Sequence, residues 1–148
     1  MDHASLIKKT FNNFDGKNED VLNQFYAENV VFIDPVLKVK DLDALKEYYS
    51  HAYSKVKSIR FEFAEMITEG QRVGAPWIMH IAVEGLNGGK SFSVSGFSQF
   101  EFNQEGKVVF HRDYVDLGAM VYERLPFQGK VIFLIKKMLR HGLGESSN

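Results

Sequence analysis

One stretch decides how the chain is interpreted, and it reads Phe110-His111-Arg112-Asp113-Tyr114-Val115-Asp116-Leu117. It places charged residues inside a β-rich run. Successive strand residues face opposite sides of a sheet, so His111 and Asp113 share one face and Arg112 lies on the other. If the first face lines a cavity, Asp113 can serve as a general base, with His111 beside it to orient the carboxylate or carry a proton. The plainer alternatives are an Asp113 that pairs with Arg112 or another cation and only holds the strand end, and a partly exposed strand histidine.

Outward from this stretch, the apolar residues alternate with polar ones. The alternation covers residues 59–63, 73–84, 92–102 and 108–115, and turns separate these segments. Such alternation is typical of strands that bury one face, so four long antiparallel strands are predicted. Pro76 falls inside the second of them and predicts a bulge or an edge there, because proline cannot donate a hydrogen bond to a neighbouring strand.

The first third of the chain has helical spacing instead. Apolar residues recur at intervals of three and four after Asp2, Asn18 and Asp41, each of which can cap a helix. The third helix is expected at about Leu42 to Tyr53, and a short strand over residues 30–34 precedes it. Helices followed by an antiparallel meander form an α+β pattern. We expect a cone-shaped fold in which N-terminal helices pack on a curved mixed or antiparallel sheet and leave a cavity between them.

The composition favours a single domain over residues 1–148. Of the 148 residues, 45% are hydrophobic, and the formal net charge is −1. A chain of this length can bury a substantial core. Nucleic-acid binding is not expected, because phosphate contacts need a basic excess. The thirteen phenylalanines can build both a core and the wall of an apolar pocket, so a small apolar ligand is the expected partner.

Motifs for metals, cofactors and membrane spans are missing from the sequence. Cysteine is absent, no two histidines stand four residues apart, and there is no Gly-rich phosphate loop. We therefore expect no metal site and no cofactor. The first residues do not form a signal segment, and no apolar run approaches the ~20 residues that span a bilayer. A cytoplasmic protein is the resulting expectation.

Residues 118–148 are predicted to form a helical C-terminal extension. Within it, residues 130–141 are apolar with a basic end. Such a segment could lie in a membrane interface, but one short segment with few cations is a weak membrane signal. We expect it to pack on its own domain or on a partner subunit, with its lysines at the wet edge, and we expect no membrane association.

Three segments, together with the order of elements, resemble those of a known family. They are residues 25–29 leading into Asp34-Pro35, the strand that begins at Lys90, and Gly106-Lys107-Val108 followed by residues 112–117. The chain resembles the SnoaL-like, or nuclear-transport-factor-like, superfamily of cone-shaped α+β folds, and within it the limonene-epoxide-hydrolase-like proteins, over roughly residues 11–123. The resemblance implies that Asp113 is the base that activates water. It also implies a homodimer formed through the outer face of the sheet.

The other catalytic residues of those hydrolases are not retained. Their arginine and acidic residue fall at Met79 and Ile81. Their water-positioning tyrosine and asparagine fall at Phe32 and Asp34. In a comparison with ketosteroid isomerases, the catalytic base matches Asp34, but the oxyanion-hole acid falls at Ser98. The resemblance therefore implies a fold and one base, and not a particular reaction.

Asp34 is the second candidate catalytic residue. In the plainer interpretation its side chain accepts backbone N–H groups in a turn. In the functional one it shares an apolar cavity with Asp113, where two carboxylates cannot both ionise easily, so the pair would supply one acid and one base. Ordinary core packing is the alternative for any pocket residue, above all for Val94 and Ile81. The predicted pocket wall consists of Phe32, Tyr48, Trp77, Met79, Ile81, Val94, Gly96 and Ser98.

Two functions remain open. The first is an enzyme that hydrolyses or isomerises a small, largely apolar molecule, with Asp113 as base and Asp34 or His111 as acid or orienting residue. The second is a non-catalytic ligand-binding or dimerising module of the same fold, in which Asp113 anchors a ligand. The apolar residues at Met79 and Ile81 favour the second function, and the presence of Asp113 favours the first.

Overall fold

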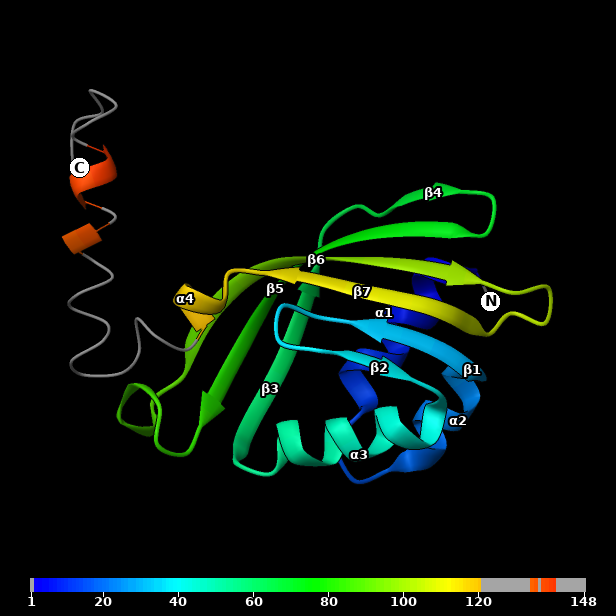
Figure 1. Ribbon diagram of the computed structural model, residues 1–148, viewed down its shortest axis with the longest axis horizontal. Coiled ribbons are helices and arrows are strands. Elements are labelled where there is room, and N and C mark those ends of the chain that lie inside the picture. The colour runs from blue at the N-terminus through cyan, green and yellow to red at the C-terminus, as the bar shows by residue number, and fades with distance from the viewer. Residues whose placement is uncertain (1, 121–133, 136, 141–148) are drawn as a thin grey trace.

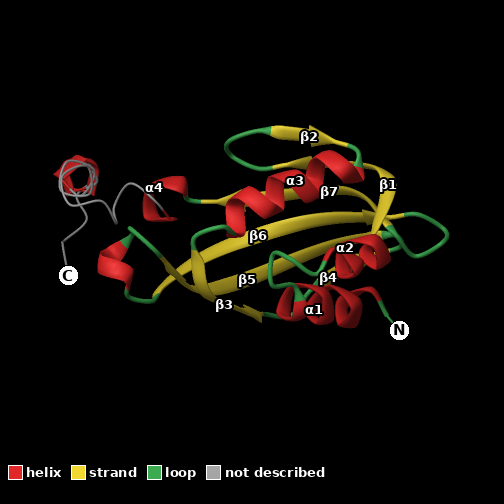
Figure 2. Cartoon of the chain, turned by 90° about the horizontal axis from the view of Figure 1, so that it is seen from below, coloured by secondary structure: helices red, strands yellow, loops and turns green. Residues whose placement is uncertain are grey.

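A curved sheet of seven strands carries three helices on one side (Figure 1). The computed structural model describes residues 2–120, 134, 135 and 137–140. Seen from below, α1 (His3–Asn13), α2 (Glu19–Phe25) and α3 (Leu42–Tyr53) lie across the same side of the sheet (Figure 2). The α+β fold predicted from the sequence is therefore confirmed.

The helices begin where the sequence predicts. The Asp2 carboxylate accepts a hydrogen bond of 2.8 Å from the Ser5 N–H and caps α1. The Asp41 carboxylate caps α3 in the same way, through a hydrogen bond of 2.8 Å from the Ala44 N–H. Each cap satisfies a backbone donor that the first helical turn leaves unpaired. The predicted bounds of α3 are confirmed.

The strands pair in the order β2-β1-β7-β6-β5-β3, and β4 pairs with one end of β5. All pairs are antiparallel except β1 and β7, which run parallel, so the sheet is mixed. The parallel pair sets Phe32 beside His111 and brings the end of β1 next to the end of β7. The strands are β1 (Tyr26–Ile33), β2 (Lys38–Lys40), β3 (Val56–Phe63), β4 (Ile67–Glu69), β5 (Arg72–Val83), β6 (Phe92–Phe102) and β7 (Val108–Val115).

β1 is longer than the sequence predicts. It begins at Tyr26, directly after the last residue of α2, whereas the pattern predicts a strand only from residue 30. Tyr26 is fully buried and pairs with Val108 of β7, and this packing overrides the helical spacing of the segment. The sequence also does not predict β2 and β4, because strands of three residues are too short to show alternation.

Pro76 lies in β5 where the neighbouring strand changes. β3 pairs with residues 77–83 of β5, and β4 pairs with residues 72–74. Neither strand therefore pairs with Pro76. On its other side, Pro76 lies opposite Phe97 of β6 in an uninterrupted register. The position is thus a local edge, as predicted, because the missing proline N–H has no strand to bond to on that side.

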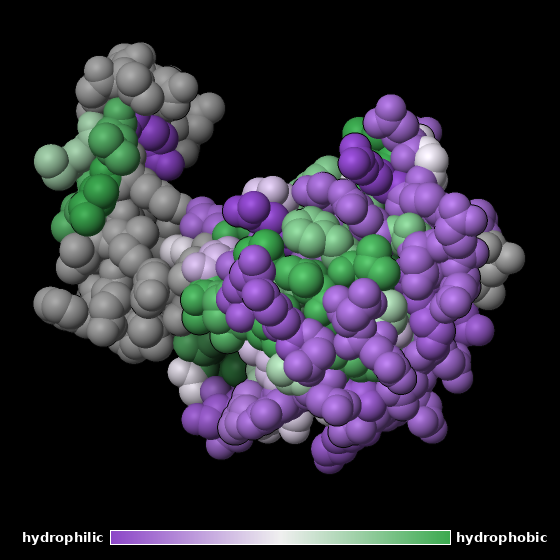
Figure 3. All heavy atoms as spheres, turned by 45° about the vertical axis from the view of Figure 1, so that its right-hand side comes forward, coloured by the Kyte–Doolittle hydropathy of each residue, from purple (hydrophilic) through white to green (hydrophobic). Residues whose placement is uncertain are grey.

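The core consists of two clusters of apolar side chains. The larger one packs helix residues such as Phe11 against Phe100 of the sheet, and the smaller one joins Trp77 with Val94 on β5 and β6. Phe61 of β3 contacts both clusters. Outside the core, hydrophilic side chains dominate the face shown in Figure 3 and surround a hydrophobic patch.

The C-terminal extension begins with α4 (Leu117–Met120), and a short 3₁₀ helix, η1 (Asn87–Gly89), lies between β5 and β6. Residues 134, 135 and 137–140 are helical. The remainder of the predicted extension, including part of the 130–141 segment, lies outside the described residues, so its packing stays a prediction. Among the helices that the structure describes, none is long and apolar enough to cross a membrane.

Candidate active site

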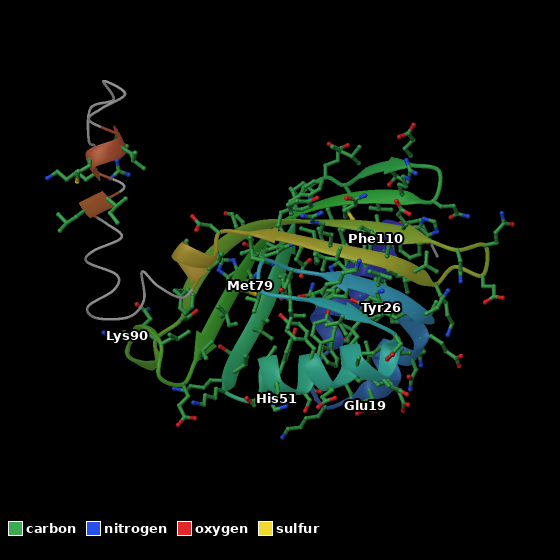
Figure 4. The ribbon with its side chains drawn as sticks, in the orientation of Figure 1. Glu19, Tyr26, His51, Met79, Lys90 and Phe110 are labelled. Carbon is green, nitrogen blue, oxygen red and sulfur yellow. The ribbon has the colours of Figure 1, made fainter. Side chains whose placement is uncertain are left out.

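A cavity of about 140 Å³ opens between the inner face of the sheet and α3. Its wall carries aromatic and aliphatic side chains, including Phe61 of β3 and Met79 of β5. Besides tyrosine hydroxyls, the polar side chains that line it in the described part of the chain are Asp34, Ser98 and Asp113. In Figure 4, Met79 and Tyr26 lie on the strands around the inner space, while exposed His51 lies at the periphery.

Asp113 lies near the end of β7, where two partners hold one of its oxygens. Ser98 is directly opposite on β6, and its Oγ donates a hydrogen bond of 2.5 Å to Asp113 Oδ1. His111, on the same face of β7, has its Nε2 at 2.6 Å from the same oxygen. Asp113 Oδ2 accepts no hydrogen bond from the described residues, and 25% of the side chain is exposed. One oxygen is therefore fixed, and the other is available to a ligand.

A buried hydrogen-bond chain continues behind Asp113. The His111 side chain is only 1% exposed, its Nδ1 lies 2.7 Å from Tyr26 Oη, and Tyr26 Oη lies 3.0 Å from Tyr49 Oη. With a neutral imidazole protonated on Nε2, Tyr49 donates to Tyr26, Tyr26 donates to His111, and His111 donates to Asp113. A second proton on Nδ1 would reverse both tyrosine bonds and leave the Tyr49 hydroxyl without an acceptor among the described residues. The network therefore assigns a neutral ring that donates to the Asp113 carboxylate.

The tyrosines around this site stay protonated at neutral pH. Burial is the largest cause that raises the pKa of Tyr26, Tyr48, Tyr49 and Tyr53, and the negative charge of Asp113 raises each pKa further. Their hydroxyl groups are consequently hydrogen-bond donors rather than anions.

Trp77 reaches the same network from β5. Its Nε1–H donates a hydrogen bond of 2.8 Å to Ser98 Oγ, which leaves the Ser98 proton for Asp113. Gly96 lies opposite Trp77 on β6, and a Cβ at this position would come within 2.2 Å of the indole ring. Only glycine lets the ring cross β6 so closely. Gly96, predicted as pocket wall, therefore lies beneath the Trp77 ring and not at the cavity.

Asp34 follows β1, and hydrogen bonds occupy both of its carboxylate oxygens. Oδ1 accepts the N–H groups of Val36 and Leu37 at 2.8 and 2.9 Å, and Oδ2 accepts the hydroxyl of Tyr48 from α3. The turn interpretation is confirmed, and Asp34 also lines the same cavity as Asp113. All three bonds need the carboxylate as an acceptor, which favours an anchoring role over proton donation.

Arg112 does not pair with Asp113. It lies on the opposite face of β7, where its guanidinium carbon is 4.9 Å from the centre of the Tyr114 ring. The predicted division of the strand faces is therefore correct, and the predicted alternative of an ion pair between Asp113 and Arg112 is wrong. The alternative of a partly exposed His111 is wrong as well, because the imidazole is buried and bonded at both nitrogens.

Most of the predicted site residues meet at the cavity. Three do not line it: His111 lies behind Asp113, Gly96 lies beneath Trp77, and Val94 packs in the smaller core cluster. Whether the others bind a ligand stays a prediction. The predicted residues that line the cavity are Asp113, Asp34, Phe32, Tyr48, Trp77, Met79, Ile81 and Ser98.

Several lining residues are absent from the sequence-based prediction. They include Tyr49 and Tyr53 of α3 and Phe61 and Phe63 of β3. The two tyrosines stand four residues apart on one helix face, and this spacing was the available signal, but ordinary core packing gives the same pattern. No group of three His, Cys, Asp or Glu residues in the described part of the chain could hold a metal ion.

Solved structures with the same fold come from several bacteria. One is an NTF2-like protein of unknown function from Burkholderia pseudomallei, with 16% identity, a TM-score of 0.70 and coverage of 81% of this chain and 95% of that one. Another, from Jannaschia sp. CCS1, is described as a SnoaL-like polyketide cyclase, with 15% identity, a TM-score of 0.70 and coverage of 80% and 88%. A third, from Catenulispora acidiphila, has a ketosteroid-isomerase-like fold and was crystallised with trimethylamine. It has 12% identity, a TM-score of 0.70 and coverage of 84% and 94%.

At these identities the likeness shows the fold alone. No curated protein matches the sequence. A specific likeness to limonene-epoxide-hydrolase-like proteins stays a prediction. The sequence itself matches a family over residues 7–111, well over half of the chain, from within α1 to His111 of β7 and just short of Asp113. The chain therefore belongs to the SnoaL-like domain family.

Proposed function

We propose that the protein is an enzyme that binds a small, largely apolar molecule in the cavity and uses Asp113 as a general base. One observation carries the proposal: Ser98 and His111 hold Asp113 Oδ1, while Oδ2 stays free beside an apolar cavity. A general base needs this combination of fixed orientation and a free lone pair. His111 does not reach the cavity, so it acts as a positioning residue.

The fold supports a small-molecule pocket. Neighbours that share it include the protein described as a SnoaL-like polyketide cyclase and the one crystallised with trimethylamine. In this chain the cavity has an apolar wall with a few convergent polar groups, which is the usual composition of a ligand site.

Two reactions fit the geometry equally. In a hydrolysis, Asp113 Oδ2 takes a proton from water while the water oxygen attacks an epoxide or lactone carbon, the ring C–O bond breaks, and the released oxygen takes the proton back from Asp113. In an isomerisation, Oδ2 takes a proton from a carbon beside a carbonyl and returns it to another carbon of the same molecule. In both reactions, the hydrogen bonds from Ser98 and His111 hold the Asp113 carboxyl group in one orientation while it gains and loses the proton.

Tyr48 and Asp34 form a second fixed polar pair in the cavity wall. The Tyr48 side chain lines the cavity, and its raised pKa keeps the hydroxyl protonated. Asp34 accepts that hydroxyl and is itself fixed by two backbone N–H groups. The single proton of Tyr48 is thereby given to Asp34, so the pair would fix the cavity wall rather than donate to the ligand.

A screen of epoxides, lactones and enolisable ketones tests the proposal. Asp113→Asn keeps the shape of the side chain and an acceptor for Ser98 and His111 but removes the base, so turnover should fall about 10²-fold or more. Asp20→Asn makes the same chemical change on the exposed surface of α2 and should retain full turnover. Equal turnover by Asp113→Asn and the unchanged protein would remove Asp113 from the mechanism.

The alternative is a non-catalytic ligand-binding or dimerising module. It is favoured by Met79 and Ile81, two apolar residues that line the cavity where the resembling hydrolases carry an arginine and an acid. Under this alternative, small molecules would change the fluorescence of Trp77 in the cavity wall, yet none would be converted. Ligand binding without turnover across the whole screen would favour it over the enzyme.

A further inference from the structure

We propose that the cavity selects for positive charge, so that a small ligand with a methylated ammonium group binds more tightly than a neutral or anionic ligand of the same shape. The inference rests on the proposed function, because it concerns the same cavity, and it adds the charge of the ligand. Two features of the wall carry it: the sign of its ionisable groups and the faces of its aromatic rings.

The ionisable side chains of the wall are all acids. Asp34 and Asp113 are the carboxylates, and the others are tyrosines, whereas no lysine, arginine or histidine of the described residues lines the cavity. In a partly enclosed site of low polarity, an unbalanced charge acts more strongly than in water. An anionic ligand would meet these carboxylates without any cation to offset them.

Hydrogen bonds hold both carboxylates at the wall without cancelling their charge. Asp34 accepts from two backbone N–H groups and from the Tyr48 hydroxyl, all of which are neutral. Asp113 accepts from the Ser98 hydroxyl and from His111, which the direction of the buried hydrogen-bond chain makes a neutral ring. The negative charge therefore remains available to a ligand.

Arg112 is the cation nearest in sequence, and it does not neutralise the site. Its guanidinium lies over the Tyr114 ring on the outer side of β7. It lines a groove beside the cavity, and three carboxylates, those of Asp34, Asp113 and Asp116, line the same groove. The groove shares Asp34 and Asp113 with the cavity, and its lining carries more carboxylates than cations.

Ring faces around the carboxylates suit an alkylated cation. The rings of Phe61 and Trp77 meet nearly at a right angle, 85°, with centres 5.6 Å apart, and form one corner of the wall. Phe32 and Tyr48 form another, with centres 5.4 Å apart. Aromatic faces attract an ammonium group through their quadrupole, most strongly for tryptophan, and methyl groups on the nitrogen remove its need for hydrogen bonds.

The volume limits the ligand to a small one. At about 140 Å³ the cavity is close to the ~150 Å³ of an engineered apolar cavity that holds one benzene molecule. A trimethylammonium head with a short chain has this size. Choline is therefore a suitable probe, and 3,3-dimethyl-1-butanol is its neutral counterpart, with carbon in place of nitrogen. The anion 3,3-dimethylbutanoate has the same bulky head.

Fluorescence titration of the full-length protein tests the inference, because Trp77 is the single tryptophan and lies in the cavity wall. Choline should bind at least about ten-fold more tightly than 3,3-dimethyl-1-butanol, a factor within the range of a desolvated cation–π contact. The butanoate should bind most weakly. Equal or tighter binding of the neutral alcohol, tightest binding of the anion, or no binding of choline would each overturn the inference.

Variants connect the selectivity to the carboxylates. Asp113→Asn and Asp34→Asn should each lower the affinity for choline several-fold and leave that for the neutral alcohol unchanged, while Asp20→Asn on the surface of α2 should change neither. Circular dichroism confirms that each variant folds, and two independent positions keep the test valid if one does not. An undiminished preference for choline in both folded variants would overturn the inference.

Failure here is distinguishable from failure of the proposed function. If the neutral alcohol binds and choline gains nothing, the charge selectivity is wrong while the small-molecule cavity stands. Turnover in the substrate screen is measured separately and depends on Asp113 as a base, whatever the charge preference of the cavity.

Discussion

At the scale of single residues, the hydrogen bonds that hold Asp113, directly or through His111, involve side chains on four separate elements. His111 shares its strand, Ser98 comes from β6, and the bonds behind His111 come from Tyr26 of β1 and Tyr49 of α3. The pairing of His111 with Asp113 follows from the two-residue period of a strand and could be predicted. The two tyrosines could not, because they approach His111 only after β1 pairs with β7 and α3 packs on β1.

Tyr26→Phe removes the central hydroxyl of this buried chain. His111 Nδ1 then loses its donor and the Tyr49 hydroxyl loses its acceptor, both in buried positions. The free energy of unfolding, measured by urea titration, should fall by about 1–3 kcal/mol, the cost of leaving a buried polar group without its partner. The ¹⁵N resonance of His111 Nδ1 should move toward that of an imine nitrogen without a hydrogen bond.

Tyr114→Phe is the matched control for this change. Tyr114 is 46% exposed on the outer face of β7 and has no part in the chain, so losing its hydroxyl should alter stability by less than about 0.5 kcal/mol. Equal unfolding free energies for the two variants would contradict the buried role of Tyr26.

At the scale of elements, the sequence predicts those parts that depend on local signals. The bounds of α3, β6 and β7 follow from a cap and from regular apolar spacing, and the structure has them as predicted. The start of β1 at Tyr26 does not follow, because pairing with β7 overrides the helical spacing there. The sequence also places Met79 and Val94 together as wall residues, and in the structure both belong to the smaller core cluster while only Met79 lines the cavity.

The N-cap of α3 gives a prediction at this scale. Asp41 accepts the Ala44 N–H and has a φ of 73°, a backbone conformation that L side chains rarely adopt. Asp41→Ala should therefore lower the free energy of unfolding by about 1 kcal/mol or more. Asp41→Asn keeps a side-chain acceptor for the Ala44 N–H, and it should stay close to the unchanged protein in the same urea titration. Equal losses in both variants would show that the capping bond does not stabilise α3.

At the scale of the whole molecule, the two faces of the sheet differ. Helices α1, α2 and α3 lie on the inner side with the cavity (Figures 1 and 2). On the outer side, Ile78 and Tyr114 are 42% and 46% exposed, and the Tyr114 ring adjoins Phe97. A polar rim beside them joins Glu62 to His80 at 2.6 Å. An apolar centre with a polar rim is the usual composition of a protein interface.

We therefore expect a homodimer through this outer face. Ile78→Glu would place a charge at its centre and should shift the protein from dimer to monomer in size-exclusion chromatography with light scattering. Val36→Glu introduces the same charge at another exposed apolar residue, outside the sheet, and should leave the dimer intact. A monomer at every concentration of the unchanged protein would contradict the expectation.

The buried tyrosines couple the cavity to the stability of the molecule at alkaline pH. Burial raises the pKa of Tyr26, Tyr48, Tyr49 and Tyr53 in the folded protein above the ordinary 10.0 that applies once the chain unfolds. Above pH 10 the folded state thus binds more protons than the unfolded state, so the free energy of unfolding is unaffected well below pH 10 and falls as the pH rises through it. Each such tyrosine contributes a decline approaching about 1.4 kcal/mol per pH unit. Tyr26→Phe removes one of these protons, so its decline in urea titrations between pH 9 and 11 should be shallower than that of Tyr114→Phe, and equal slopes would contradict burial as the cause.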